Sequence, residues 1–124
     1  MRALFEATGF EITEALSLLN TARDGEILVS GGGTRLPVWP QTLSDILGRP
    51  MTVCADPDVS AVGAACLAWE GLTGQAATKP PAAGQRYEPV TERAGPLRQR
   101  ADNYYQTRDF MAAYYQSRAG KSTL

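Results

Sequence analysis

The sequence feature that most constrains the fold is a run of three glycines between an apolar segment and a helix-like segment. The run occupies residues 31–33, follows the strand-like residues 26–29 and precedes the helix-like residues 37–47. Glycine has no Cβ, so a ligand can approach the backbone amides of such a turn closely. A following helix presents free N–H groups and the positive end of its dipole. This combination favours contact with a phosphate group or a nucleotide.

The glycine run matches neither of the common phosphate-binding motifs. It lacks the Gly-Lys-Ser/Thr ending of one motif and the GxGxxG spacing of the other. A sharp strand-to-helix turn that binds no ligand explains the same residues equally well. Both interpretations stay open on the local sequence alone.

The composition excludes several classes of protein and site. A chain of 124 residues holds one domain or part of one. A net charge of −1 gives no reason to expect a nucleic-acid partner. No apolar run reaches the roughly 20 residues of a membrane span, and the N-terminus does not resemble a secretory signal, so we expect a cytoplasmic protein. The chain has two cysteines and no histidine, which excludes a histidine-activated nucleophile and leaves few ligands for a metal site.

Hydrophobic periodicity predicts strands that alternate with helices. Helices are expected over residues 2–20, 37–47, 58–72 and 96–117, and short strands over residues 26–30 and 51–55. Both strands are apolar throughout, as in a parallel sheet that is covered on both faces. Gly9 lies on the apolar stripe of the first helix and predicts close packing there. Asp56-Pro57-Asp58 is expected to start the third helix, with a carboxylate cap and the proline in the first turn.

The order of elements predicts an α/β fold with a parallel pair of strands. Two strands are too few for a self-sufficient sheet, so we expect part of a larger domain whose uncovered surfaces promote self-association. Residues 73–95 are rich in glycine and proline and are predicted to be linker-like. The tyrosines of the last helix favour core or interface packing over base stacking, because the helix has no basic stripe.

Three segments resemble the C-terminal domain of the FGGY carbohydrate kinases. Residues 29–41 with 43–48 resemble the family's glycine turn, basic residue and Leu-Trp-x-Gln helix. Residues 2–7 resemble its Arg-Ala-x-x-Glu-Gly helix, and residues 61–65 resemble its Ala-Leu-Gly-Ala-Ala helix. The three segments come in the family's order and spacing over about residues 2–72. The tyrosine-rich end is compatible with xylulokinase-like members.

The resemblance implies a partial ribonuclease-H-like, actin-like ATPase domain, with short parallel strands flanked by helices. It implies phosphoryl transfer from ATP, with Mg²⁺, to a sugar hydroxyl. The residues that it assigns to the nucleotide (ATP or ADP) are Gly31, Gly32, Gly33, Thr34, Arg35, Gln41, Gly63 and Ala64. Arg35 is either structural or adjacent to the nucleotide. Asp45 is expected to be a solvated or capping acid with a structural role.

The chain also departs from the family's pattern. The N-terminal lobe with the catalytic aspartate has no match here, so we expect no catalytic residue in these 124 residues and no kinase activity from them alone. Leu36 stands where the family often has Ser or Asn. The expected division is a kinase core (1–72), a linker-like segment (73–95), a packed C-terminal helix (96–119) and a frayed tail (120–124). Two other hypotheses are a non-catalytic nucleotide-binding or interaction module and a truncated fragment without independent activity.

Overall fold

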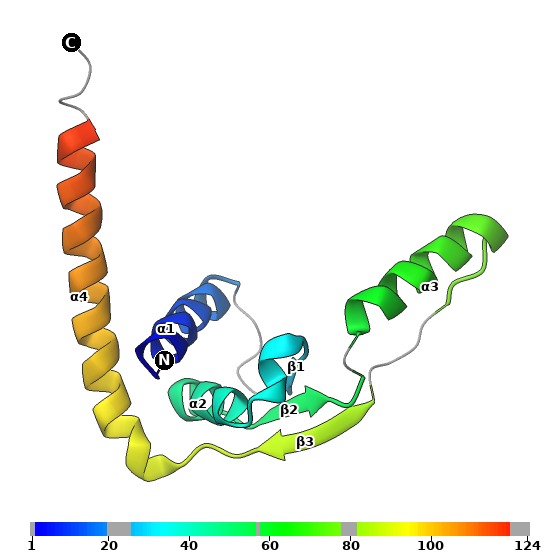
Figure 1. Cartoon of the computed structure of the whole chain (residues 1–124), viewed down its shortest axis with the longest axis horizontal. Coiled ribbons are helices and arrows are strands. Elements are labelled where there is room, and N and C mark those ends of the chain that lie inside the picture. The colour runs from blue at the N-terminus through cyan, green and yellow to red at the C-terminus, as the bar shows by residue number, and fades with distance from the viewer. Residues whose placement is uncertain (1, 20–25, 57, 78–81, 120–124) are drawn as a thin grey trace.

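The described part of the chain contains four α-helices, three strands and two short 3₁₀ helices. The structure is a computed structural model that describes residues 2–19, 26–56, 58–77 and 82–119. In chain order the elements are α1 (Arg2–Leu18), β1 (Ile27–Val29), η1 (Gly32–Arg35), α2 (Val38–Leu47), β2 (Met51–Cys54), α3 (Val59–Thr73), β3 (Ala83–Tyr87), η2 (Thr91–Arg93) and α4 (Ala94–Ala119) (Figure 1). The four predicted helices are confirmed, with ends shifted by at most two residues. The predicted tail 120–124 lies outside the described residues.

The strands form one mixed sheet in the order β1-β2-β3. The predicted parallel pair is confirmed, because β1 and β2 run parallel with Ile27 opposite Met51 and Val29 opposite Val53. Helix α2 makes the crossover between these two strands. Strand β3 then returns antiparallel along the other edge of β2. The sheet therefore has β2 at its centre, with an α-helical crossover on one side and an antiparallel edge strand on the other.

Strand β3 lies within the segment that was predicted to be linker-like. Its sequence, Ala-Gly-Gln-Arg-Tyr, shows no apolar alternation, and Tyr87 is its one buried residue. The pairing has a register irregularity between Thr52 and Cys54. A Cβ on Gly84 would lie 2.6 Å from the carbonyl oxygen of Val53. This close backbone contact explains why a residue that weakens strands stands inside β3.

The core lies where α2 packs between α1 and the sheet. Its buried hydrophobic residues are Phe10, Leu43, Met51, Cys54, Tyr87 and Leu97. A Cβ on Gly9 would lie 2.5 Å from Cδ1 of Ile46, so the predicted close packing at Gly9 is confirmed, and its partner is α2. The rings of Phe5 and Trp39 add a tilted aromatic contact between the two helices, with centroids 5.1 Å apart. Tight packing here fixes α2, which begins just after the glycine run.

Strand β1 is less buried than its apolar sequence predicts. Leu28 is 48% exposed, so the expected cover on both faces of this strand is wrong for the described chain. Burial along β1 alternates, with half-buried Ile27 and Val29 on one face and exposed Leu28 on the other, so one face of the strand is open to solvent.

Helices α3 and α4 extend away from the core in different directions (Figure 1). None of the residues of α3 is buried, and the helix projects from the end of the sheet. Asp58 is the N-cap residue of α3 and makes no side-chain capping hydrogen bond, and the predicted first-turn Pro57 lies outside the described residues. Helix α4 packs along α1 and then continues beyond it. No helix in the described ranges is long and apolar enough to cross a membrane.

Candidate functional site

The glycine run forms a turn that leads from the end of β1 into η1. Gly31 has φ 108° and ψ 175°, a region of backbone space that is essentially restricted to glycine. The Thr34 hydroxyl and the Thr34 amide both donate to the carbonyl oxygen of Gly31, at 2.7 and 3.1 Å. These two bonds hold the turn closed. Leu36 then ends η1, and α2 begins at Val38.

The other two glycines of the run have different surroundings. A Cβ on Gly33 would lie 2.9 Å from Cδ1 of the Trp39 ring, so Gly33 lets the indole pack against the turn. A Cβ on Gly32 would meet no atom within 4 Å. The fold of the described chain therefore explains Gly31 and Gly33. At Gly32 it leaves open space beside the backbone.

A hollow of about 500 Å³ lies beside Gly32. It is lined by Ser30, Gly31 and Gly32 on one side and by Asp58, Val59, Ser60 and Ala61 on the other. These residues follow β1 and β2, so the hollow lies at the carboxyl ends of the two parallel strands. Open α/β sheets bind their ligands at this edge. The first turn of α3 adds backbone N–H groups that have no partner within the helix.

The structure brings only some of the predicted nucleotide contacts to this hollow. Gly31 and Gly32 line it, and Gly33, Thr34 and Arg35 continue from it through η1. Gly63 and Ala64 lie further along α3, are exposed, and are not among its lining residues.

Gln41 is engaged elsewhere in the domain. Its Nε2 donates to Oδ1 of Asp45 and to the carbonyl oxygen of Glu88, both at 2.9 Å. The two donor hydrogens of the amide are therefore used in contacts that join α2 to the segment after β3. A nucleotide contact by Gln41 would have to use the amide oxygen.

Asp45 is buried and links α2 to the segment that follows β3, a role that the sequence does not indicate. Its side chain is 3% exposed, which makes the predicted solvated acid wrong while its structural role is supported. Oδ1 accepts the Val90 amide at 2.8 Å in addition to Gln41, and Oδ2 pairs with Nη1 of Arg93 at 2.8 Å. A buried carboxylate is stable in a protein when it is paired and hydrogen-bonded in this way. Spacing i to i+4 hints at the Gln41 contact, but no local signal identifies Val90 or Arg93.

The described residues hold no group of three or more His, Cys, Asp or Glu side chains that could bind a metal ion. The hollow itself contains one carboxylate, that of Asp58. Mg²⁺ in nucleotide sites commonly takes one or two protein carboxylates together with phosphate oxygens. The hollow therefore fits a metal that arrives with a nucleotide and does not fit one held by the protein alone.

Comparisons with known proteins identify the family to which this arrangement belongs. Residues 1–70 match the model of the FGGY family of carbohydrate kinases, C-terminal domain. The chain is 29% identical over 115 residues to xylulose kinase of Streptomyces rubiginosus. This match covers 90% of this chain and 23% of that protein. It is 30% identical over 74 residues to L-fuculokinase of Escherichia coli O157:H7. That match covers 57% of this chain and 16% of the relative.

Solved structures agree with the sequence comparisons. The crystal structure of xylulose kinase from Rhodospirillum rubrum superposes with a TM-score of 0.72 at 26% identity, over 93% of this chain and 24% of that one. Ligand-bound xylulose kinase from Lactobacillus acidophilus, at 22% identity, shares the fold with a TM-score of 0.73 over 94% of this chain and 25% of that one.

The chain belongs to the FGGY family of carbohydrate kinases and carries residues of the C-terminal domain of that family. Its fold is that of these kinases, the actin-like ATPase architecture. It spans about a quarter of the length of the relatives that it matches.

Proposed function

We propose that this chain supplies the nucleotide-binding side of an ATP-dependent sugar kinase of the cytoplasm, with residues 1–72 as the core of that domain. Kinases of this family use ATP. The observation that supports the proposal is the hollow between Gly31–Gly32 and the first turn of α3. Its place at the carboxyl ends of two parallel strands, and the open space beside Gly32, suit a ligand that approaches the backbone closely.

The residues around the hollow are suited to holding and orienting phosphate groups. The free amides of the first turn of α3 and the positive end of its dipole attract an anion. Asp58 at the same mouth repels a bare anion, and a magnesium ion carried by the nucleotide offsets this repulsion. Phosphoryl transfer depends mainly on positioning and on stabilising charge. Arg35 would add a contact from η1, whereas Thr34, whose two donors bond to Gly31, would act by holding the turn in shape. Gly63 and Ala64 would approach the base from α3.

The sugar is proposed from the relatives. Xylulose kinases recur among both the sequence relatives and the solved structures, so a pentulose or a related sugar is the proposed acceptor. The group that takes the proton from the sugar hydroxyl is not assigned to any residue of this chain. We therefore expect these 124 residues to bind nucleotide and to lack phosphotransferase activity on xylulose.

Calorimetric titration of the 124-residue chain with ADP and Mg²⁺ tests this function. We expect saturable binding, and at least a tenfold loss of affinity in Gly32→Leu, because the new side chain fills the hollow. Gly71→Leu is the matched control, since Gly71 also has open space around it but lies near the far end of α3. Absence of binding by the unaltered chain, or equal loss in both variants, would contradict the proposal. Coupled-assay turnover of xylulose by this chain would contradict the assignment of a binding role alone.

A further inference from the structure

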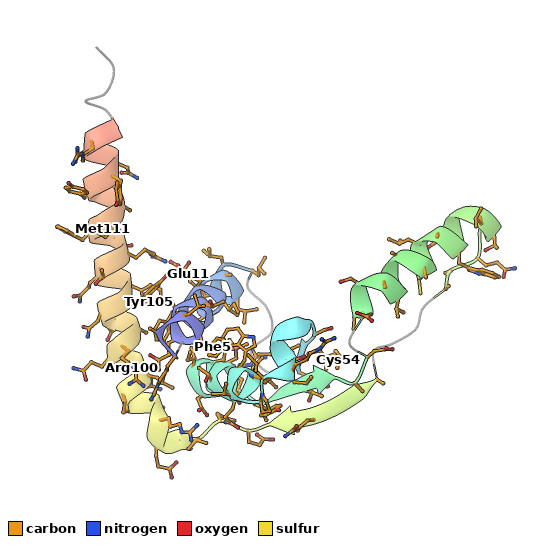
Figure 2. The ribbon with its side chains drawn as sticks, viewed as in Figure 1. Phe5, Glu11, Cys54, Arg100, Tyr105 and Met111 are labelled. Atoms are coloured by element: carbon orange, nitrogen blue, oxygen red, sulfur yellow. The ribbon has the colours of Figure 1, made fainter. Side chains whose placement is uncertain are left out.

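Three ion-paired arginines lie along the attachment of helix α4 to the rest of the chain. Arg93 ends η2 just before α4, and Arg100 and Arg108 lie on α4. They are spaced seven and eight residues apart, which is about two helical turns. We call these three residues the arginine ladder. Each of them pairs with an acid on α1 or α2. Figure 2 shows Arg100 and Tyr105 of α4 and Glu11 of α1 along the seam between the two helices.

The pairs of the ladder differ in burial. Arg93 meets the buried Asp45 at 2.8 Å, and Nε of Arg100 lies 3.1 Å from Oε2 of the buried Glu6. Nε of Arg100 is itself buried and makes no aligned hydrogen bond, so this middle pair is poorly formed. Arg108 reaches Glu11 at 3.0 Å and also pairs with Glu14 in a more exposed position.

Apolar packing beneath α4 is thin. Among the described residues of α4, Leu97 is the buried hydrophobic one, at 5% exposure. Leu97 lines two separate hollows, one of about 320 Å³ with Phe10 and Ile46 and one of about 430 Å³ with Phe5 and Val38. Close packing around a side chain provides dispersion contacts that an adjoining void does not. Leu97 is therefore the one buried hydrophobic residue that the described part of α4 supplies, and it has space on both sides. The half-buried rings of Tyr104 and Tyr105 add contacts with Phe10 of α1, at centroid distances of 5.6 and 6.3 Å, and the Tyr105 hydroxyl donates to the Phe10 carbonyl oxygen at 2.7 Å.

The far half of α4 adds little to the attachment. Phe110, Tyr114 and Tyr115 beyond the last rung of the ladder are exposed. Elements with few buried apolar contacts open at lower free energy than the core. Ion pairs that reach the surface weaken as salt screens them, whereas apolar contacts do not.

We propose that α4 is a strap that the arginine ladder holds in place. At raised ionic strength α4 leaves the α1–α2 face while the sheet stays folded. Release exposes Leu97 and the face of α1 that carries Glu6 and Glu11. A helix that has lost its tertiary contacts frays, so its amides then exchange with solvent. The strap is a conformational device of this domain and does not depend on whether the hollow binds a nucleotide.

Hydrogen–deuterium exchange on the 124-residue chain tests the strap. Between about 50 mM and about 500 mM NaCl, a range over which the screening length falls several-fold, we expect amides of residues 97–108 to exchange at least tenfold faster. Amides of β2 serve as the internal reference and should not change. Arg108→Gln should give fast exchange already at low salt. Arg98→Gln is the matched control on the same helix, because it removes the same charge without removing a rung.

Three results would overturn the proposal. One is exchange in α4 that stays constant or slows with salt, which would mean that burial of Leu97 holds the helix. Another is exchange of α4 and β2 at one common rate, which would mean that α4 opens only on global unfolding. The third is an equal effect of the two arginine variants. Should Arg108→Gln fail to fold, the salt titration of the unaltered chain still decides between these outcomes.

Discussion

At Gly31 the backbone has φ 108° and ψ 175°, a combination that residues with a Cβ rarely adopt. Gly32, its neighbour, has open space where a Cβ would lie, and its φ is not positive. Two adjacent glycines of the same run are therefore needed for separate reasons. The first serves the fold of the turn, and the second serves the proposed approach of a ligand.

These surroundings predict different stabilities for two alanine variants. Gly31→Ala should lower the free energy of unfolding by about 1–3 kcal/mol, because alanine is strained in this backbone region. Gly32→Ala should change it by less than about 0.5 kcal/mol, as expected of a substitution at an open surface position. Urea unfolding followed by circular dichroism measures both. Equal destabilisation in the two variants would show that the turn differs from the geometry described.

The sequence indicates residues whose role is local and misses residues whose role depends on distant partners. The glycine run and Gly9 could be identified because the first serves a turn and the second a helix face. Asp45 could not, since two of its partners lie 45 and 48 residues further along the chain. Gln41 was assigned to a nucleotide by resemblance, and its donor contacts within the domain became visible only in the fold.

At the contact between helices α1 and α4, hydrogen bonds, charges and burial shift the pKa values of several side chains. A hydrogen bond from Tyr104 and the guanidinium of Arg108 hold the pKa of Glu11 below its ordinary value of 4.5. The same hydrogen bond to Glu11, together with burial, raises the pKa of Tyr104 above its ordinary value of 10. Burial and the neighbouring Glu14 raise the pKa of Tyr105 as well. The seam is therefore best held with the carboxylate charged and both phenols neutral.

These shifts predict how the contribution of Tyr104 to stability depends on pH. The lowered pKa of Glu11 adds stability that is present above 4.5 and is lost as the pH falls through the folded value. The raised pKa of Tyr104 adds stability that is present below 10 and is lost as the pH rises through its folded value. Tyr104→Phe should therefore destabilise the chain at neutral pH and less so at about pH 3 or about pH 11. Chemical unfolding at the three pH values measures this, and an equal effect at all three would mean that the Tyr104–Glu11 bond adds nothing.

The elements themselves were predictable to different degrees. Apolar periodicity identified all four helices and the parallel pair of strands, because each presents a continuous stripe or run. Strand β3 was missed, because an edge strand with one buried residue carries no alternation and contains Gly84. The burial of β1 was overestimated, since an apolar run does not reveal how many neighbours the strand has in the described chain.

For the whole molecule, the main feature is apolar surface that the described chain leaves uncovered. Trp69 and Leu72 lie on one face of α3 and Leu67 on the opposite face, and all three are exposed. A helix that is apolar all round is ordinarily buried. Leu28 adds an exposed apolar residue on the edge strand β1. These surfaces suit contact with further protein.

We expect the 124-residue chain to self-associate through α3 as its concentration rises. Size-exclusion chromatography with light scattering should show a mass above that of the 13.3 kDa monomer at high concentration. Leu67→Glu combined with Leu72→Glu should restore the monomer, because charges on α3 oppose apolar contact. Gln85→Glu combined with Gln106→Glu adds the same charge at exposed positions elsewhere and should not. A monomer at all concentrations would show that α3 needs no cover.

Trp39 lies where the glycine turn meets the packed helices, with its ring against the backbone of Gly33 and beside the ring of Phe5. The other indole of the chain, Trp69, is exposed on α3. Replacing Trp69 with Phe leaves Trp39 as the one tryptophan of the chain, and it lies beside the turn and outside the hollow. The fluorescence emission of Trp39 then reports on the conformation of the turn without an added dye. Binding of a ligand beside Gly32 can therefore be followed by the fluorescence of the protein itself.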